Sequence, residues 1–342
     1  MTVKATWKRF WRWFQRQSDR PLRRLLLTVL FLGPAVAVIA YRTYQNRDVL
    51  RDYAWRWRPG FWGIALLSYS LALFAVLWAW NTLMGHLTGS SRFPSNARIY
   101  CLTNLSKRIP GPFWYLLGRV YFYRAEGVRA SATLAATALE QVFFALTGMM
   151  VYFLTLPFSG RVRPLHLGVA AAIFFLALLL LQPPIFNRAA RFLLRRAGSD
   201  ARVQITYRLL LPVTVAYLLG WILPGLGLYG LAASIYPLPW SLLQSFVGMW
   251  AVSGTLSLLL STVMLGSGVR EVALSFLLVP YMPQPIAVVV AVLFWFIVTV
   301  GEVLWAGIFA LLGRRGVRAG FQQEGVDPAS GGGGPPVAPG DR

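Results

Sequence analysis

Charged residues are scarce in this 342-residue chain, and acidic residues are the scarcest. Only 13% of the residues are charged, against about 25% in a typical soluble domain. The single cysteine, Cys101, excludes an internal disulfide and argues against a thiolate metal site. The phosphate-binding pattern Gly-x-x-x-x-Gly-Lys-Ser/Thr is absent, which argues against ATP-driven activity. No cofactor is expected.

Apolar residues make up 57% of the chain and are gathered into long blocks. Each block is about as long as the ~20 residues that a helix needs to cross a hydrocarbon core of ~30 Å. One such block could be a buried core helix, but a whole series indicates an all-α, polytopic helical membrane protein. The uninterrupted spans are expected at 24–41, 61–83, 132–157, 165–184, 207–234, 240–262 and 285–312.

Two further segments, 92–130 and 263–284, are apolar but interrupted. Pro110-Gly111-Pro112 breaks the first, and Gly266-Ser267-Gly268 breaks the second. Broken helices at membrane depth are tolerated only where protein buries them or where they line a cavity. Two broken segments in one chain indicate a transporter-like site. The protein has eight spans if 263–284 crosses the membrane fully, and seven if that segment is re-entrant.

The net charge of +22 comes from 33 Lys and Arg residues. Such an excess can indicate nucleic-acid binding, but here the basic residues cluster in short connections beside the apolar blocks, as the positive-inside rule requires. We therefore expect no nucleic-acid partner, and we expect contact with anionic lipid head groups. The loops at 84–130 and 185–206 should be cytoplasmic, with a cytoplasmic N-terminus. The predicted location is a bacterial cytoplasmic (inner) membrane.

The two ends differ from the membrane domain, which we expect at 24–315. Residues 1–23 are a basic amphipathic segment in which Trp7, Phe10, Trp11 and Phe14 have helical spacing. This pattern is typical of a helix that lies in the head-group plane. Residues 324–342 are rich in Gly and Pro, and this composition predicts a disordered tail.

Three glutamates lie within apolar stretches: Glu140, Glu271 and Glu302. A charge at the centre of a span costs about 2.5–3.5 kcal/mol on insertion scales. Each glutamate therefore either forms a buried salt bridge that orients helices or lies on a polar pathway. The candidate basic partners, all within the broken segments, are Lys107, Arg119 and Arg270.

The turn before Arg270 has the features of a phosphate site. Gly266-Ser267-Gly268 allows a close backbone approach and can begin a helix, whose N-terminus offers free N–H groups and a positive dipole end. Arg270 adds a cation, so the phosphate of a phospholipid or a polyprenyl phosphate would fit. The alternative is an interfacial turn with a solvated arginine.

The apolar stretches contain a series of short motifs in a fixed order. They are Asn104-Leu105-Ser106-Lys107-Arg108-Ile109-Pro110-Gly111, Gly118-Arg119, Gly127-Val128, Glu140, Gly268-Val269-Arg270-Glu271 and Gly301-Glu302. Together these motifs resemble a known family, the membrane domain of lysylphosphatidylglycerol synthase/flippase proteins, and the resemblance covers about 20–315. Gln141 stands where the family has Arg, and Met264-Leu265-Gly266-Ser267 departs from its Pro-Gly-Gly stretch.

The resemblance implies a helical bundle with re-entrant segments that moves a lipid between leaflets. Family members also carry a soluble aminoacyl-transferase domain, whereas this chain ends in the Gly/Pro-rich tail, so we expect it not to synthesise the lipid. The expected substrate is a phospholipid or polyprenyl-linked lipid. The candidate binding residues are Asn104, Lys107, Gly111, Arg119, Glu140, Gly268, Arg270, Glu271 and Glu302.

Two other functions remain open at this point. A membrane glycosyltransferase using a polyprenyl-phosphate sugar would need acidic residues in its first outer loop, where Asp48 and Asp52 lie. A non-catalytic scaffold for a lipid or cell-envelope enzyme would need neither these nor the buried glutamates. A second copy of the chain or a partner enzyme could accompany any of the three.

Overall fold

The computed structural model describes residues 21–55, 58–89, 91–108, 114–159, 164–196, 205–261 and 268–323. All regular structure in these ranges is helical, as the sequence predicts. Most of the amphipathic segment at 1–23, the tail at 324–342 and the candidate residue Gly111 lie outside the described residues.

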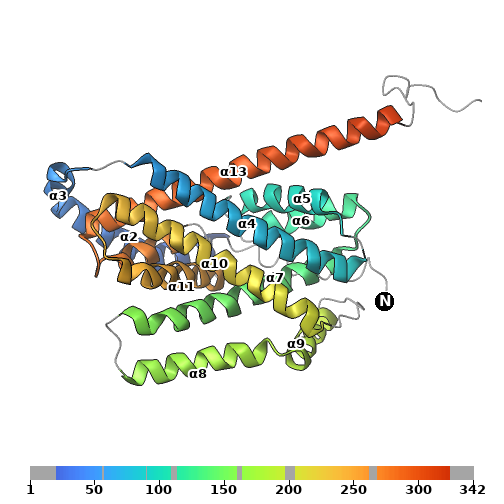
Figure 1. The fold of residues 1–342 in the computed structure, drawn as a ribbon, viewed down its shortest axis with the longest axis horizontal. Helices are drawn as coiled ribbons and strands as arrows, with labels where there is room; N and C mark the ends of the chain where they lie inside the picture. Colours follow the sequence, from blue (N-terminus) through green and yellow to red (C-terminus); the bar gives the residue numbers. More distant parts are fainter. Residues whose placement is uncertain are drawn as a thin grey trace, which may run out of the picture.

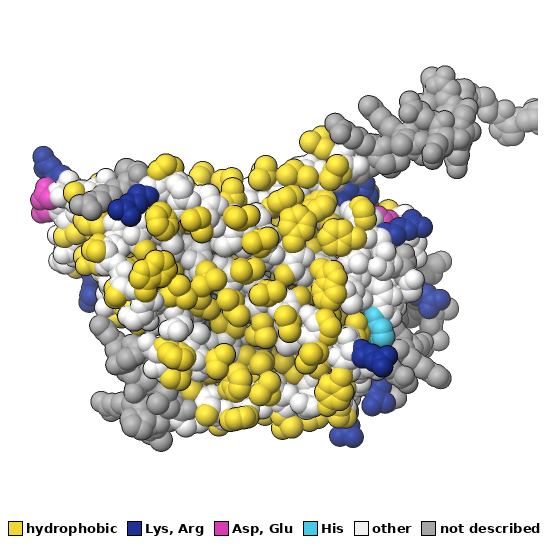
Figure 2. All heavy atoms as spheres, in the orientation of Figure 1, with side chains coloured by type: hydrophobic (Ala, Val, Ile, Leu, Met, Phe, Trp, Pro, Cys, Tyr) yellow, Lys and Arg dark blue, Asp and Glu magenta, His cyan; other side chains and the backbone are white. Residues whose placement is uncertain are grey.

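Five helices in the described ranges are long and apolar enough to cross a membrane. The long helices lie roughly along one common direction (Figure 1). An apolar belt covers the visible face, and basic side chains gather at its two ends (Figure 2). This distribution fits a bilayer around the bundle. The five spans belong to α4 (Pro59–Thr88), α7 (Ala130–Thr155) with the 3-10 turn η2 (Leu156–Ser159), α10 (Tyr207–Ile235), η3 (Trp240–Leu242) with α11 (Leu243–Ser261), and α13 (Gln284–Gln323).

Three other helices fall where the sequence places apolar or basic segments. The expected span at 24–41 is part of α2 (Pro21–Gln45), which keeps Pro34 inside the helix. The expected span at 165–184 is α8 (Pro164–Leu180), whose apolar stretch is shorter than those of the five long spans. The basic segment at 185–206 contains α9 (Pro183–Arg196), and Asn187 holds it to the start of α10 through two 2.8 Å hydrogen bonds with the backbone of Ile205. The short helix α3 (Arg47–Asp52) follows α2.

Both interrupted segments form half-length helices. The first contains α5 (Phe93–Leu105), the turn η1 (Ser106–Arg108) and α6 (Trp114–Ala125). The second contains α12 (Val269–Leu278). Ten residues of helix extend only about 15 Å, half of the ~30 Å core. α12 therefore does not cross the membrane on its own, which favours the re-entrant arrangement over a full additional span.

The two half-length segments enter the bundle from opposite ends. α4 and α13 run in the same direction, from the end near α3 toward the end where α5 and α6 lie (Figure 1). α5 begins shortly after α4 ends, whereas α12 ends shortly before α13 begins. The segments therefore converge on the middle of the molecule.

Small residues bring the central helices together. A Cβ on Gly225 of α10 would lie 2.6 Å from the Cα of Val247 on α11, and one on Gly227 would lie 2.2 Å from the Oγ of Ser68 on α4. Helices in membranes associate by such close packing because lipid provides no hydrophobic drive between them. These contacts fix α10 between α4 and α11, which form part of the wall of the central cavity.

Candidate functional site

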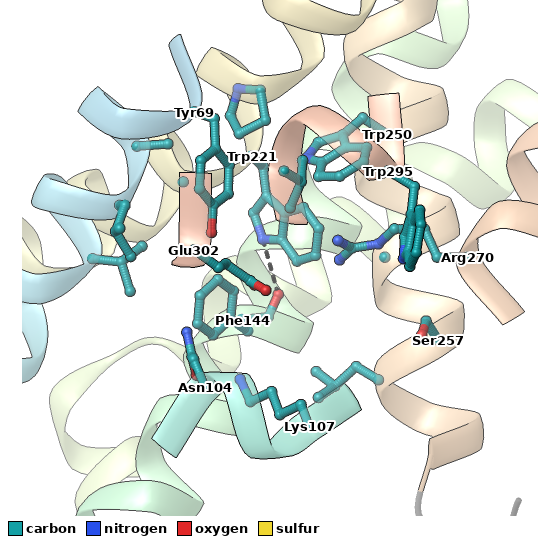
Figure 3. A pocket seen from close by; sticks show the side chains of 18 of the residues that line it. Tyr69, Asn104, Lys107, Phe144, Trp221, Trp250, Ser257, Arg270, Trp295 and Glu302 are labelled. Carbon is teal, nitrogen blue, oxygen red and sulfur yellow. Dashed lines mark hydrogen bonds between the residues drawn. The ribbon is translucent and has the colours of Figure 1, made fainter. Parts of the chain in front are cut away.

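A cavity of about 400 Å³ lies where the half-length segments meet the long helices. Its walls come from the segment α5–η1–α6, from α12, and from α4, α7, α10, α11 and α13. Figure 3 shows side chains from these elements pointing into one space. The charged groups among its described lining residues are Lys107, Arg270, Glu271 and Glu302.

Arg270 is held against the tryptophans of the cavity wall. It is the second residue of α12, and its guanidinium carbon lies 4.3 Å from the ring centroid of Trp250 and 6.0 Å from that of Trp221. α11 has a glycine at this contact: a Cβ on Gly254 would lie 2.5 Å from Nη2 of Arg270 and 2.4 Å from the Trp221 ring. Gly254 therefore makes room for the guanidinium. Trp221 is itself fixed, because its Nε1 donates 3.2 Å hydrogen bonds to Phe144 O and Thr147 Oγ1.

Lys107 reaches the cavity from the tip of the other half-length segment. It lies in η1, and its Nζ is 5.1 Å from the ring centroid of Tyr115 on α6. Both residues line the cavity. The ring of Tyr115 therefore attracts the ammonium group and holds it at the cavity wall.

Two carboxylates share the cavity with these cations. Glu271 lies in the first turn of α12, where the positive end of the helix dipole favours a negative charge. Glu302 comes from α13, directly after Gly301, where a Cβ would lie 2.7 Å from the Tyr69 ring on α4. The close approach of α13 to α4 at Gly301 therefore sets the position of Glu302. The described lining thus carries two groups of each sign.

Asn104 adds a neutral polar group beside Lys107. It lies at the end of α5, is only 8% exposed, and lines the cavity. Its Oδ1 is buried without a hydrogen-bond partner among the described residues. Buried polar atoms in native proteins are normally paired, so this amide is a further candidate contact for a bound molecule.

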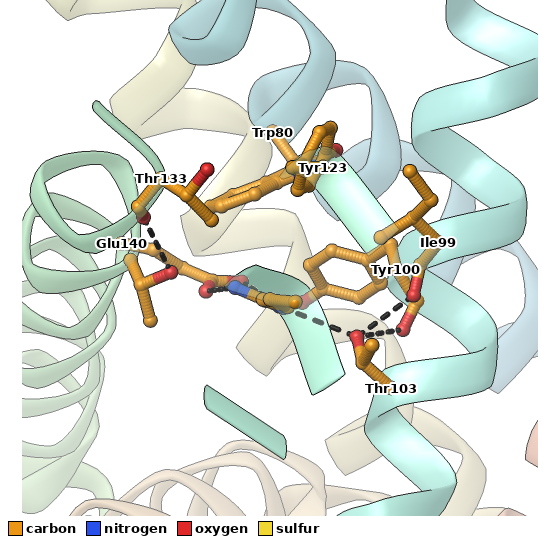
Figure 4. A network of polar contacts seen from close by, with 9 residues as sticks. Trp80, Ile99, Tyr100, Thr103, Tyr123, Thr133 and Glu140 are labelled. Atoms are coloured by element: carbon orange, nitrogen blue, oxygen red, sulfur yellow. Dashed lines mark hydrogen bonds and ion pairs between the residues drawn. The ribbon is translucent and has the colours of Figure 1, made fainter. Parts of the chain in front are cut away.

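Arg119 and Glu140 were expected to bind ligand, but neither is among the cavity's lining residues. They form an ion pair with each other, α6 to α7, and both side chains are 0% exposed. The guanidinium also lies 4.2 Å from the ring centroid of Trp80 and 4.5 Å from that of Tyr100. Figure 4 shows this network between the helices. The pair thus fits the alternative reading of a buried salt bridge that orients helices.

The ion pair nevertheless lies directly behind two aromatic residues of the cavity wall. Tyr100 and Tyr115 line the cavity, and the rings of both lie within 5.6 Å of the Arg119 guanidinium carbon. Behind them, Trp80 Nε1 donates to Tyr123 Oη, and Tyr123 Oη donates to Asn96 Oδ1, each at 2.8 Å. This chain of hydrogen bonds holds α4, α5 and α6 together, so the first half-length segment is a rigid support for Lys107.

Six of the nine candidate residues therefore share one cavity: Asn104, Lys107, Gly268, Arg270, Glu271 and Glu302. Sequence reasoning missed the aromatic walls, because Trp and Tyr residues in apolar blocks look the same whether they face lipid or a cavity. Gln141, which the sequence shows only as a departure from the family's Arg, also lines the cavity. The aromatic residues of the lining are Tyr69, Tyr100, Tyr115, Phe144, Trp221, Trp250 and Trp295.

The carboxylates proposed for a glycosyltransferase lie elsewhere. Asp48 and Asp52 are exposed on α3, and neither is a lining residue of the cavity. No group of His, Cys, Asp and Glu in the described ranges has a geometry that could hold a metal ion. Nothing in the described site therefore favours that enzyme.

Comparisons with protein-family models, with curated proteins and with solved structures yield no match for this chain. The function must therefore be argued from the site itself, since fold alone does not specify function.

Proposed function

We propose that this membrane protein binds the phosphate-bearing head group of a lipid in the central cavity and moves the lipid between leaflets. The observation that carries the proposal is the convergence of Lys107 and Arg270, from two half-length segments, on one aromatic-lined cavity. A cation at membrane depth costs free energy and therefore marks a functional position. Lys107 and Arg270 both line the cavity, and Arg119 pairs with Glu140 outside it.

The arrangement of the segments also suits movement of a head group. Segments that enter from opposite ends of the bundle and meet at its middle are typical of proteins that expose one site alternately to two sides. Arg270 lies in the first turn of α12, where backbone N–H groups and the helix dipole favour a phosphate. The resemblance to the lysylphosphatidylglycerol synthase/flippase membrane domain adds support on the same residues.

The test is lipid scrambling in proteoliposomes that contain the purified full chain. Fluorescent phospholipids in the outer leaflet are bleached by a membrane-impermeant reductant, and the fraction that becomes accessible with time reports transbilayer movement. We expect movement above that of protein-free vesicles. Arg270→Gln and Lys107→Gln should each slow it about tenfold or more, because each removes a charge-assisted contact to the phosphate.

The matched control is Arg51→Gln, which makes the same kind of change at an exposed arginine on α3. It should leave the rate unchanged, and all variants must keep the wild-type elution profile and melting temperature. A wild-type rate equal to that of empty vesicles, with phospholipids and with a polyprenyl phosphate, would contradict the proposal.

A further inference from the structure

Resting on the proposed function, we propose that the head group carries a polyol ring, a sugar or an inositol, joined to its phosphate. The observation is a set of neutral hydrogen-bonding side chains in the cavity lining. They are the amides of Asn104 and Gln141 and the hydroxyl of Ser257. All three are uncharged, so they play no part in balancing the ionised groups of the lining and remain to be matched by a ligand.

Asn104 is the most deeply buried of the three. It is 8% exposed, and its Oδ1 has no hydrogen-bond partner among the described residues. It lies at the end of α5, three residues before Lys107 in η1, and Figure 3 shows the two side chains on the same segment at the cavity. An amide offers a donor and an acceptor, and a hydroxyl group can pair with either. A hydroxyl next to a phosphate bound at Lys107 would therefore satisfy this amide.

Gln141 supplies a second amide from α7. Its neighbour Glu140 pairs with Arg119 outside the lining, whereas Gln141 lines the cavity and is half-buried. It precedes Phe144, another lining residue, by three positions, so both lie on one face of the helix. No hydrogen bond joins its side chain to the described part of the chain. Since buried polar groups are normally paired, this amide too indicates a polar ligand.

Ser257 supplies a hydroxyl from α11. It follows Gly254 by three residues and therefore lies on the helix face that Arg270 contacts. Figure 3 shows Ser257 on the side of Arg270, and Asn104 on the side of Lys107. Each cation of the proposed phosphate site thus has a neutral hydrogen-bonding group in its neighbourhood. A phosphate held there would place its substituent among neutral donors and acceptors.

The aromatic walls suit a ring. A sugar or inositol ring has two faces of C–H groups and an edge of hydroxyls, and aromatic side chains provide apolar surfaces for such faces. Phe144, Trp221 and Trp295 line the cavity together with the two amides. Small-molecule sites commonly combine apolar walls with a few placed polar groups, in pockets of about 300–1,000 Å³. The volume of about 400 Å³ therefore suits a head group, with the acyl chains outside among the apolar helix faces.

The experiment compares phosphatidylinositol with phosphatidylmethanol in the scrambling assay, with identical acyl chains and the label on one chain. Both lipids carry one phosphodiester and the same charge, and only phosphatidylinositol has ring hydroxyls. We expect the wild type to move phosphatidylinositol about tenfold faster, because only this lipid pairs with the amides. Gln141→Met and Asn104→Leu should each lower the ratio of the two rates at least threefold, since each replaces an amide with an apolar side chain of similar size.

The matched control is Gln45→Met, at an exposed glutamine near the end of α2, and it should keep the wild-type ratio. A ratio separates selectivity from folding, because a misfolded variant loses both rates together. The second amide variant keeps the test decisive if one of the two fails to fold. Soluble inositol 1-phosphate, tested for binding by a shift in melting temperature, distinguishes a lipid head group from a free sugar phosphate.

The outcomes are distinct. Equal wild-type rates for the two lipids overturn recognition of the ring while leaving lipid movement intact. An unchanged ratio in both amide variants overturns the role given to Asn104 and Gln141. Binding of inositol 1-phosphate without movement of either lipid overturns the proposed function and makes the cavity a site for a soluble polyol phosphate. Neither binding nor movement overturns both proposals.

Discussion

Arg119 on α6 and Glu140 on α7 are paired to each other, and both side chains are completely buried. Removing two ions from water costs about as much free energy as their attraction in the interior provides. A buried pair of this kind therefore specifies a helix arrangement more than it adds net stability. The aromatic rings of Trp80 and Tyr100 enclose the guanidinium. The pair therefore fixes how α6 lies against α7, and it places the tyrosines of the cavity wall.

Removing one member of this pair should destabilise the protein strongly. Glu140→Gln leaves the Arg119 charge buried without its counter-ion, and we expect a loss of about 3–5 kcal/mol in the free energy of unfolding. Denaturant titration in detergent, followed by tryptophan fluorescence, measures it. The control is Glu126→Gln, whose pair with Arg98 spans 3.5 Å with about a third of each side chain exposed, and which should cost about 0–1 kcal/mol.

Replacing both members together should be far less harmful than the sum of the single changes. In the double variant Arg119→Met and Glu140→Leu no charge is left buried, and apolar residues can fill the space. We expect the double variant to unfold at a higher denaturant concentration than Glu140→Gln alone. If the double variant lost as much free energy of unfolding as Arg119→Met and Glu140→Leu lose together when measured singly, a direct interaction between the two residues would be contradicted.

Gly254→Ala should disturb the cavity while the fold survives. The new methyl group would lie 2.5 Å from the Arg270 guanidinium and 2.4 Å from Trp221, so one of the two must move, at a cost of about 1–3 kcal/mol. Lipid scrambling should slow more than the change in melting temperature explains. Gly307→Ala is the matched control, because a Cβ there meets nothing within 4 Å. Equal effects of the two substitutions would contradict the role given to Gly254.

Gly268→Ala should weaken the start of α12. Gly268 has φ +99, in the region that residues with a side chain rarely adopt, and such strain costs about 1–3 kcal/mol. Since Arg270 is two residues away, we expect both a lower melting temperature and slower scrambling. Gly63→Ala, inside α4 with open space around it, should lower neither. A fully active Gly268→Ala variant would show that the turn tolerates a side chain.

The topology makes a prediction about labelling from the two sides of the membrane. Asp48 is exposed on α3, and Arg129 is exposed between α6 and α7. α3 and α6 lie at opposite ends of the bundle (Figure 1), and the native Cys101 is buried. With a cytoplasmic N-terminus, Asp48→Cys should react with a membrane-impermeant maleimide on intact cells. Arg129→Cys should react only after permeabilisation. The reverse pattern would mean that the chain is inserted the other way round.

Much of the architecture follows from the sequence alone. The length of each apolar block is set by the thickness of the hydrocarbon core, so the positions of α4, α7, α10, α11 and α13 could be predicted closely. The two interrupted segments could also be found, because Gly and Pro break helices where lipid would otherwise require an unbroken one. The structure places six of the nine candidate residues around one cavity, and their role in binding stays a prediction.

Only the tertiary structure decided which charges belong to each other. Arg119 and Arg270 look alike in the sequence, since each lies in a broken, semi-apolar segment and follows a glycine by one or two residues. One is neutralised by Glu140 in the protein interior, and the other lines the cavity with Trp250. The sequence could not distinguish them because helices in a bilayer are apolar on every side, so their periodicity does not show which face meets lipid, a neighbour or a cavity. Helix rotation and close contacts at residues such as Gly254 and Gly301 settle that choice, and they exist only once the bundle is assembled.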